Sequence, residues 1–443
     1  MFILKSFQKK LTSSAIDGLQ RGVSSFIVAP TGSGKMVMLT YIASVLNCNV
    51  LIIEHRDELI EQCEKTIKEF GIEPSIMKSG TKDHNPESNV KIAMIQTINR
   101  RDTFNWSPDV IIIDEAHLSA ARTYISIITE RFPNALRLCF SATPDRLDGK
   151  GFDHICDEII VGPSIKELIR SGDLVHFKYL EFDGVDLSIV KTMGGEYDQD
   201  AVAEQMAGMA DDIVDTWIDQ CKDRQTVVFT SNKKQSKNLC SIFRDKGFSA
   251  EHVDGDTPPG VRKSIIKRYR EGKTQILCNC GIVIEGFDVK SISCIVLAMA
   301  TKSLSKFLQC IGRGMRVCEG KIDLFILDFG NNSAMHGYPD DDREWTLAPK
   351  ISNKRGPRST EYIDDDGYSD GEKTAAKDKY VLEAYDYGIE SEFAKRERGK
   401  IRDCPAWIPR TWRNWWVELE RYRIANSLPA GYSEEHARAL IQR

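Results

Sequence analysis

Short runs of apolar residues alternate with helix-like stretches along most of the chain. In the first 175 residues, the apolar runs fall at 25–29, 50–54, 91–95, 110–114 and 136–140. Stretches with apolar residues at helical spacing, such as 57–70, separate several of these runs. This alternation is typical of a doubly wound parallel sheet, because parallel strands are joined by helical crossovers. The pattern predicts an α/β fold for residues 1–175.

A second series with the same alternation begins near residue 225. Its apolar runs lie at 226–229, 249–253, 275–280, 294–298 and 324–328, and the segments expected to be helical lie at 234–246, 260–271 and 303–311. The pattern therefore predicts a second α/β lobe over 225–335. Residues 176–224 are less regular, and we expect them to form a connection between the lobes, with a break at Gly194-Gly195.

The pattern changes again after the second series. Residues 336–378 are rich in polar residues and glycine, and we expect an extension followed by a mobile linker. Residues 379–443 regain aromatic side chains, and three tryptophans there, Trp412, Trp415 and Trp416, recur at helical spacing. We predict a small, mainly helical C-terminal domain. Packing of its aromatic face on the second lobe is favoured over base stacking, with a DNA role for its basic face.

Composition excludes several classes of protein. The 443 residues are 41% hydrophobic and 28% charged with a net charge of −5, as in an ordinary globular protein of two or three domains. No run of eighteen apolar residues occurs, so no membrane span is expected. The N-terminus lacks the apolar core of a signal peptide, which favours the cytoplasm. The 12 cysteines form no paired C-x-x-C knuckles, so we expect reduced thiols and no zinc.

Two short motifs carry the candidate chemistry. Residues 29–35 read Ala-Pro-Thr-Gly-Ser-Gly-Lys directly after an apolar run, which is typical of a turn whose N–H groups and lysine bind phosphates. Asp114 and Glu115 follow a buried run of apolar residues, and ligands of parallel sheets bind at the ends of such strands. Both motifs in this order indicate a protein that binds and hydrolyses a nucleoside triphosphate.

Met36 departs from the usual pattern of such a loop. The residue after the lysine is normally Thr or Ser, whose hydroxyl binds Mg²⁺. A thioether is a poor ligand for so hard a cation. Either water replaces the hydroxyl or turnover is weakened, so an ATP switch that hardly hydrolyses is one alternative.

These motifs, with others in the same order, resemble the superfamily 2 DEAH-box helicases. The resemblance spans about residues 4–348 and is strongest to DNA helicases with a type III restriction-subunit-like motor, including compact phage-encoded branch-migration helicases. It implies two tandem RecA-like lobes that use ATP and Mg²⁺. Lys35 would hold the γ-phosphate, Asp114 the Mg²⁺, and Glu115 the attacking water. The other residues implied to contact the nucleotide from the first lobe are Gln8, as the adenine reader, Thr31, Gly32, Ser33, Gly34 and Met36.

The resemblance assigns further roles in the second lobe. Residues 309–316 are similar to an arginine-finger motif, in which Arg313 and Arg316 meet the γ-phosphate and Gln309 helps to place the water. Gly286 and Asp288 match a motif beside the nucleotide and the lobe interface.

Other matched residues would grip a polynucleotide or couple hydrolysis to motion. The residues expected on the strand-contacting face are His55, Arg56, Gln96, Thr97, Thr230, Ser231 and Asn232. Each of these could also serve ordinary turn or cap chemistry. Ser141, Ala142 and Thr143 match the coupling motif, and residues 144–151 match the DNA-helicase subgroup.

The expected protein is an ATP-dependent DNA helicase or translocase that acts on a single-stranded tract of forked or branched DNA. It would work in recombination, repair or replication, as a monomer in the cytoplasm, which is the host cytoplasm if a phage encodes it. The resemblance implies that the protein would move along the DNA strand in the 3′→5′ direction. An RNA helicase and the motor subunit of a restriction or recombination complex remain alternatives.

Overall fold

The computed structural model describes most of the first 349 residues. The described ranges are 3–78, 85–100, 106–118, 127–146, 149–182, 185–281, 287, 289–349 and the backbone of 381–386. All of them belong to the first of two units into which the chain divides, Met1–Tyr387 and Gly388–Arg443. The predictions for Gly286, Asp288 and the three C-terminal tryptophans concern residues outside the described ranges.

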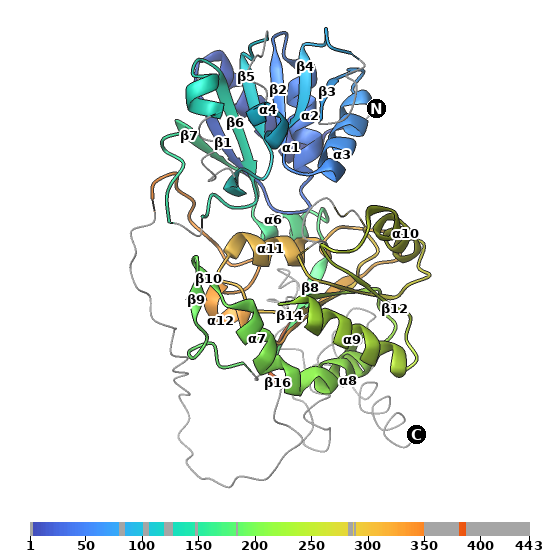
Figure 1. Cartoon of the computed structure of the whole chain (residues 1–443). Helices are drawn as coiled ribbons and strands as arrows, with labels where there is room; N and C mark the ends of the chain where they lie inside the picture. The colour runs from blue at the N-terminus through green and yellow to red at the C-terminus, as the bar shows by residue number, and fades with distance from the viewer. Residues whose placement is uncertain are drawn as a thin grey trace, which may run out of the picture. The chain divides into compact units, whose positions relative to one another are not determined.

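The first lobe is built on a parallel sheet of seven strands in the order β3-β4-β2-β5-β6-β1-β7 (Figure 1). The strands are β1 (Ser25–Val28), β2 (Val50–Glu54), β3 (Ser75–Met77), β4 (Val90–Met94), β5 (Val110–Ile113), β6 (Leu136–Ser141) and β7 (Glu158–Val161). The five predicted strands are confirmed. The edge strands β3 and β7 were not predicted.

Helices cover both faces of this sheet. They are α1 (Ser6–Gln20), α2 (Lys35–Val45), α3 (Asp57–Lys68) and α4 (Ile95–Arg100), with short helical turns at Ala116–Leu118 and Ile127–Arg131. Helix α6 (Ile165–Arg170), which follows β7, packs instead in the hydrophobic cluster of the second lobe, through Leu168 and Ile169. Alternate strand residues point to opposite faces. Ile52 therefore packs with α1, α2 and α3, whereas its neighbour Leu51 packs in a second cluster with Ile98 and Phe152. Strands buried on both faces give the continuous apolar runs seen in the sequence.

The second lobe has a seven-stranded sheet in the order β12-β13-β11-β14-β15-β8-β16. The strands are β8 (His176–Phe182), β11 (Thr226–Thr230), β12 (Ala250–Val253), β13 (Ile276–Asn279), β14 (Cys294–Ala298), β15 (Asp323–Asp328) and β16 (Val381–Asp386). The neighbours are parallel except for β16, which runs antiparallel to β8. The five strands predicted between 225 and 335 are confirmed, and so is the prediction of two α/β lobes.

Two boundary predictions were wrong. Residues 176–224 are not a simple connection, because β8 is an interior strand of the second sheet. Helices α7 (Gln199–Met206) and α8 (Ala210–Cys221) also pack against this sheet, through Trp217 among others. The polar residues Lys178 and Glu181 interrupt the apolar run of β8, which hid the strand. Strand β16 also belongs to the second sheet, although its residues were assigned to a C-terminal helical domain.

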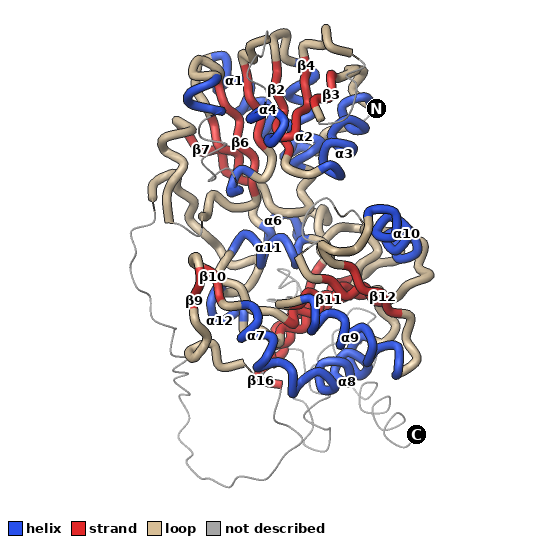
Figure 2. The backbone as a smooth tube through the Cα atoms, in the orientation of Figure 1, coloured by secondary structure: helices blue, strands red, loops and turns tan. Residues whose placement is uncertain are grey.

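The remaining elements of the second lobe are helices and a short hairpin (Figure 2). The helices are α9 (Lys233–Asp245), α10 (Pro259–Arg270), α11 (Leu304–Gly312) and α12 (Asn332–His336), and α7 and α8 are joined by a turn at Ala207–Met209. The hairpin pairs β9 (Thr192–Met193) with β10 (Glu196–Tyr197), and its turn is the predicted break at Gly194-Gly195, where both φ angles are positive. Within the described ranges, no helix is long and apolar enough to cross a membrane.

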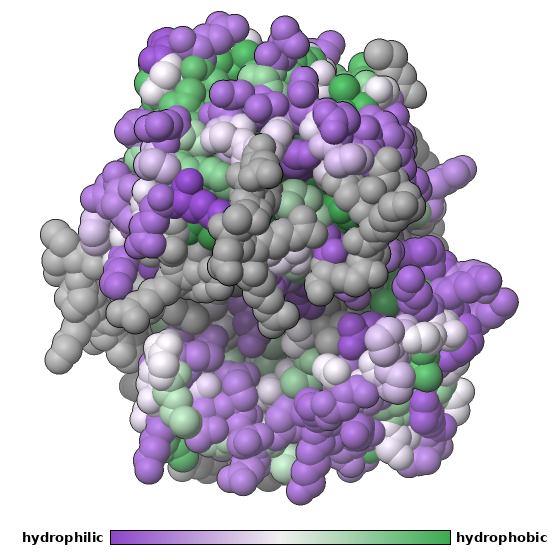
Figure 3. All heavy atoms as spheres, turned by 45° about the horizontal axis from the view of Figure 1, so that its top comes forward, coloured by the Kyte–Doolittle hydropathy of each residue, from purple (hydrophilic) through white to green (hydrophobic). Residues whose placement is uncertain are grey.

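The surface of the described residues is largely polar. On the face drawn in Figure 3, hydrophilic residues cover most of the described surface, and hydrophobic residues show between them. After α12 the chain returns to the first lobe. The carbonyl oxygen of Leu347 accepts hydrogen bonds from the backbone N–H groups of Phe152 at 2.7 Å and Asp153 at 3.2 Å. Trp345 and Leu347 also pack against the hydrophobic cluster that contains Phe152.

Candidate functional site

The phosphate loop connects β1 to α2. Gly32 and Gly34 have φ angles of 92° and 85°, which L side chains rarely adopt. Gln8 of α1 fastens this loop, because its Nε2 donates to the carbonyl oxygen of Ser33 at 2.8 Å. A Cβ on Gly34 would lie 2.6 Å from that Nε2 and would displace the Gln8 amide, while the positive φ of Gly34 itself favours glycine. Gln8 thus contacts the phosphate loop, whereas its predicted role with adenine remains a prediction.

Asp114 and Glu115 stand at the end of β5, in front of the loop. The Nζ of Lys35 lies 4.0 Å from Oε1 of Glu115 and donates to the carbonyl oxygen of Ala29 at 3.4 Å. Burial, together with the neighbouring charge of Glu115, raises the pKa of Asp114 to about 6. Glu115 has a φ of 46°, an uncommon backbone conformation for this residue type. Such strain is typical of functional sites, where the surroundings hold a side chain in a required place.

Buried hydroxyls line the loop, although Met36 contributes none. Met36 is buried among the apolar residues of the lobe core, so its thioether packs there. The hydroxyl oxygens of Thr31 and Ser33 are buried and have no hydrogen-bond partner among the described residues. Buried polar atoms rarely stay unpaired in a native state. These hydroxyls and the neighbouring Lys35 therefore fit a bound triphosphate.

The same residues fit Mg²⁺ that arrives with a nucleotide. Across the described ranges, no group of three or more His, Cys, Asp or Glu side chains could hold a metal. Mg²⁺ in phosphate-transfer sites is usually held by one or two carboxylates together with the phosphates and waters. Asp114 can supply such a carboxylate next to the loop.

Helix α11 brings the second lobe to this site. The Nε2 of Gln309 donates to Oε2 of Glu115 at 3.0 Å and lies 3.5 Å from Nε2 of His117. Gly312 lies against the phosphate loop, since a Cβ there would be 2.3 Å from the Cβ of Thr31. Glu115 thus contacts both Lys35 of the first lobe and Gln309 of the second.

The two candidate arginine fingers lie beside the same loop. A Cβ on Gly32 would lie 3.5 Å from the Cγ of Arg316. The Nη1 atoms of Arg313 and Arg316 donate to the carbonyl oxygen of Phe287 at 3.0 and 3.4 Å. Phe287 lies between the predicted residues 286 and 288, so the structure brings these two motifs of the second lobe together.

The predicted coupling residues lie at the end of β6, where Ser141 contacts both the segment after the carboxylates and the start of the phosphate loop. Ser141, Ala142 and Thr143 are all buried. The Oγ of Ser141 lies 3.0 Å from Nδ1 of His117, and its carbonyl oxygen accepts from the N–H of Ala29 at 2.9 Å. Movement of the segment around His117 would therefore be transmitted through Ser141 to Ala29, at the start of the phosphate loop.

The candidate polynucleotide contacts of the first lobe follow the ends of β2 and β4. His55 and Arg56 are partly exposed and precede α3, while Gln96 is exposed and Thr97 is buried in α4. The carboxyl ends of parallel strands meet at one edge of a sheet, so these residues share an edge with the nucleotide site. Their contact with a polynucleotide remains a prediction.

In the second lobe, Thr230, Ser231 and Asn232 lie between β11 and α9. The hydroxyl of Thr230 donates to the carbonyl oxygen of Asn279 at 3.0 Å. Asn232 caps α9, because its Oδ1 accepts from the N–H of Gln235 at 2.8 Å. The Oγ of Ser231 is buried and finds no partner in the described part of the chain. Of the three, Ser231 therefore has a hydroxyl available for a ligand.

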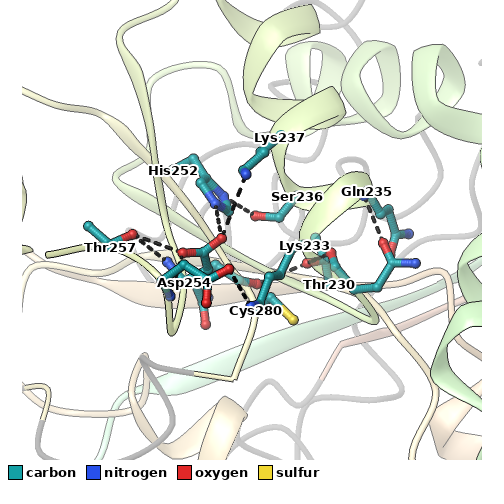
Figure 4. A network of polar contacts seen from close by, with 12 residues as sticks. Thr230, Lys233, Gln235, Ser236, Lys237, His252, Asp254, Thr257 and Cys280 are labelled. Atoms are coloured by element: carbon teal, nitrogen blue, oxygen red, sulfur yellow. Dashed lines mark hydrogen bonds and ion pairs between the residues drawn. The ribbon is translucent and has the colours of Figure 1, made fainter.

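A polar network beside these residues was missed by the sequence analysis (Figure 4). His252 lies between Ser236 and Asp254, with Nδ1 2.7 Å from the Ser236 Oγ and Nε2 3.0 Å from the Asp254 Oδ2. Burial alone would raise the pKa of Asp254, but hydrogen bonds from His252 and Thr257 outweigh it and hold the pKa at about 2.

Lysines of α9 complete the network. Nζ of Lys233 lies 2.6 Å from Asp256, and Nζ of Lys237 lies 3.9 Å from Asp254. Lys233 also borders a cavity of about 970 Å³, which Ser231 and Cys280 line as well. No local sequence motif predicts this network, because residues 236 and 252–257 are brought together only by helix packing and strand register.

Two family models match the chain over the parts that carry the site. One, described as type III restriction enzyme, res subunit, covers residues 2–146, and the other, described as helicase conserved C-terminal domain, covers residues 209–318. The first contains the phosphate loop and both carboxylates. The second contains Gln309 and the two arginines.

Known proteins similar to this chain agree with these matches. A 51.5 kDa protein of a Lactococcus phage is 30% identical over 72% of this chain and 68% of its own length. The Saccharomyces cerevisiae protein IRC3, which its name assigns provisionally to the ATP-dependent helicases, is 30% identical over 74% of this chain. The chain spans only 51% of IRC3.

The fold also resembles solved structures. A structure described as a fragment of a provisionally assigned HsdR subunit of a type I restriction enzyme from Vibrio vulnificus superimposes with a TM-score of 0.59. The superposition covers 77% of this chain and 68% of that one, at 20% identity. This likeness supports the architecture of two RecA-like lobes.

Proposed function

Since the chain belongs to the superfamily 2 helicases with a type III restriction-subunit-like motor, and is an ATP-dependent helicase, we propose that its substrate is DNA and that it unwinds or remodels forked or branched duplexes. ATP hydrolysis would drive relative motion of the two lobes while they hold a single strand.

The contact that carries the proposal joins Glu115 and Gln309, residues of different lobes whose side chains are 3.0 Å apart. Glu115 is placed to orient water and accept its proton. Gln309 fixes the carboxylate only when α11 lies against the phosphate loop. Hydrolysis would then require the lobes to be together, and loss of the terminal phosphate would remove a ligand they share.

Lys35 would hold the terminal phosphates, with Thr31 to Gly34 wrapped around them, and Asp114 would hold Mg²⁺. When bound, Mg²⁺ supplies positive charge that offsets charge developing on the phosphates. Arg313 and Arg316 would add charge from the second lobe. We expect Arg316→Ala to retain nucleotide binding and to lose about 100-fold or more in turnover. Equal turnover by the variant and the unaltered chain would contradict this role.

Similarity to restriction-enzyme motors supports DNA over RNA. The resemblance of residues 144–151 to a DNA-helicase subgroup motivates the same choice. Arg146 of this stretch is buried, with its guanidinium 5.5 Å from the ring centre of Phe152. This arrangement would brace the stretch beside the coupling residues. An RNA helicase is the second candidate, because the nucleotide-site residues do not distinguish the two substrates.

ATPase assays with matched nucleic acids test the substrate. Hydrolysis should rise several-fold with single-stranded or forked DNA and much less with RNA of the same sequence. Unwinding of single-tailed, forked and four-way DNA would then show the preferred shape and the direction, expected to be 3′→5′. If no DNA stimulates hydrolysis, the proposal is wrong. Stronger stimulation by RNA than by DNA would favour an RNA helicase.

A third candidate is a motor subunit of a restriction or recombination complex. The restriction-subunit family match motivates this alternative. Size-exclusion chromatography of the purified chain mixed with extract of its native cell would separate the candidates. A monomer that unwinds DNA alone is expected, whereas activity confined to a larger complex would support the subunit.

A further inference from the structure

Lys321 lies outside the helicase motifs, in a tight turn between the arginine segment and β15. The turn is closed by a hydrogen bond of 3.1 Å from its own N–H to the carbonyl oxygen of Cys318. Its side chain reaches back toward the protein. Nζ donates to the carbonyl oxygens of Arg316 at 3.0 Å, Lys290 at 3.3 Å and Gly314. An ammonium group has three donors, and here three backbone carbonyls receive them.

These carbonyls belong to the two segments that build the arginine site. Gly314 and Arg316 are on the turn that follows α11, and Lys290 follows Phe287 in the neighbouring segment. Arg313 and Arg316 already connect the segments by donating to the carbonyl oxygen of Phe287 at 3.0 and 3.4 Å. Lys321 therefore makes a second connection between the same two segments.

The turn after α11 is also held by apolar and backbone contacts. A Cβ on Gly314 would lie 2.4 Å from Leu324 of β15, so the turn packs directly on that strand. The N–H of Val175 donates to the carbonyl oxygen of Met315 at 2.9 Å. These contacts fix the middle of the turn, while Lys321 holds the carbonyls on each side of it.

We propose that Lys321 is a positioning residue for ATP hydrolysis: its ammonium group fixes the turn at 313–316, so that both guanidinium groups are presented together to the nucleotide. Lys321 itself acts on the turn and not on the nucleotide. The inference rests on the proposed function, since it assumes that Arg313 and Arg316 act on the terminal phosphate. It adds a residue that neither the motifs nor the family matches pointed to.

The surroundings of Lys321 make this connection sensitive to pH. Burial lowers its pKa to about 7, Cys318 and Asp323 oppose this shift, and Arg316 and Arg224 add to it. Asp323 also forms an ion pair with Arg224, whose Nη1 lies 2.6 Å from the Asp323 Oδ1. The charged form is thus present below about pH 7 and is lost as the pH rises through that value.

Solvent can reach this position. A cavity of about 590 Å³ is lined by Lys321 and Arg224, and its charged neighbours there are Asp219, Lys222, Asp223 and Glu319. Proton exchange with water would therefore not require the lobe to unfold. A neutral amine has one donor fewer and no charge, so it would hold three carbonyls less firmly.

Three variants test the inference: Lys321→Met, Lys321→Arg, and Lys267→Met as a control on the exposed face of α10. We expect Lys321→Met to lower kcat roughly tenfold with KM for ATP nearly unchanged, because the phosphate loop is untouched. The control should match the unaltered chain. Equal kcat for Lys321→Met and the unaltered chain would overturn the inference.

The pH profile separates positioning from simple stabilisation. The unaltered chain should lose ATPase activity above about pH 7, as Lys321 loses its proton. This alkaline loss should be absent in Lys321→Arg, since arginine stays charged. A profile unchanged in Lys321→Arg would overturn the inference, whereas a change in thermal stability alone would show a purely structural role and also overturn it.

Hydrogen exchange gives a readout that does not depend on activity. Amides at 287–290 and 313–316 should exchange faster in Lys321→Met than in the unaltered chain or in Lys267→Met. If the unaltered chain fails to hydrolyse ATP, the proposed function fails, and exchange still decides whether Lys321 holds the turn. If Lys321→Met does not fold, the comparison of Lys321→Arg with the unaltered chain decides. Unchanged exchange in a folded Lys321→Met would contradict the inference.

Discussion

Glu115 is the residue whose surroundings bear most directly on catalysis. Its carboxylate lies 4.0 Å from Lys35, 3.4 Å from His117 and 3.0 Å from Gln309. Each of these neighbours comes from a different segment, and all three lie around one buried acid. The carboxylate is therefore held in a fixed orientation before any water is bound.

Glu115→Gln should abolish turnover and keep nucleotide binding. The amide is nearly isosteric but cannot accept a proton, so we expect kcat to fall at least about 100-fold. Steady-state ATPase assays and titration with a fluorescent nucleotide measure the two properties. Glu69→Gln, at the exposed end of α3, is the matched control. Retained turnover in Glu115→Gln would remove Glu115 from the mechanism.

Met36→Thr tests the unusual residue of the phosphate loop. The new hydroxyl can bind Mg²⁺, so the half-saturating Mg²⁺ concentration for ATPase activity should fall several-fold. Because Met36 is buried in the lobe core, the smaller side chain should also lower the free energy of unfolding by about 1–3 kcal/mol. Chemical denaturation and Mg²⁺ titration measure the two effects. An unchanged Mg²⁺ requirement would show that a hydroxyl at position 36 does not contribute to Mg²⁺ binding.

Among single residues, sequence reasoning found those within local motifs. Lys35, Asp114 and Glu115 follow apolar runs at fixed offsets, so the place of Lys35 at the start of α2 and of both carboxylates at the end of β5 could be predicted. The pairing of His252 with Ser236 could not, because it depends on how α9 packs against β12. Lys321 was missed for the same reason, since its three carbonyl partners belong to other turns.

At the scale of elements, burial on both faces decided which strands could be predicted. Strands such as β5, with four buried apolar residues, give an unbroken run. Strand β8 mixes buried with partly exposed positions and includes charged residues, so its sequence resembles a connection. The order of strands in the second sheet could not be predicted either, because β8 pairs with β15, which is far away in the sequence.

The loop from β12 to α10 depends on one carboxylate. Asp254 accepts hydrogen bonds from the hydroxyl of Thr257 and the N–H of Asp256, both at 3.0 Å, and it also pairs with His252. Its pKa of about 2 lies below the ordinary aspartate value, so its ionised form stabilises the fold. That stability is present above about pH 4 and is lost as the pH falls toward 2.

Asp254→Asn should therefore lower the free energy of unfolding by about 2 kcal/mol at pH 7. The difference from the unaltered chain should shrink as the pH falls from about 4 toward 2. Urea denaturation at several pH values measures it. Asp245→Asn, at the exposed end of α9, is the control and should change little. A difference that is constant with pH would show that the ionised form of Asp254 is not what stabilises the loop.

For the whole molecule, the chain crosses between the two lobes more than once, since β16 lies again in the second sheet. It passes from the first lobe to the second before β8, and the extension after α12 returns to the first lobe. Gly151 marks the return, because a Cβ there would lie 2.1 Å from the carbonyl oxygen of Leu347 and 2.6 Å from the next residues of the extension. These are backbone atoms, so they cannot move aside as a side chain end could.

Gly151→Ala should release the extension from the first lobe. We expect faster cleavage by trypsin after Arg343, with the ATP site still able to bind nucleotide. Gly260→Ala is the control, since a Cβ at that position meets nothing within 4 Å. Limited proteolysis followed by mass spectrometry measures the rate. An unchanged rate in Gly151→Ala would show that the extension does not depend on this contact.

The place of β8 limits how such a motor can be divided or recombined. A half that starts at residue 225 keeps Gln309 and both arginines but lacks an interior strand, so its sheet would be left with a gap between β15 and β16. A boundary between β7 and α6, at residues 162–164, leaves each half its full set of strands and keeps α6 with the second-lobe cluster in which Leu168 and Ile169 pack. Exchange of halves between related motors should therefore be made between β7 and α6, well upstream of the point where the second set of motifs begins.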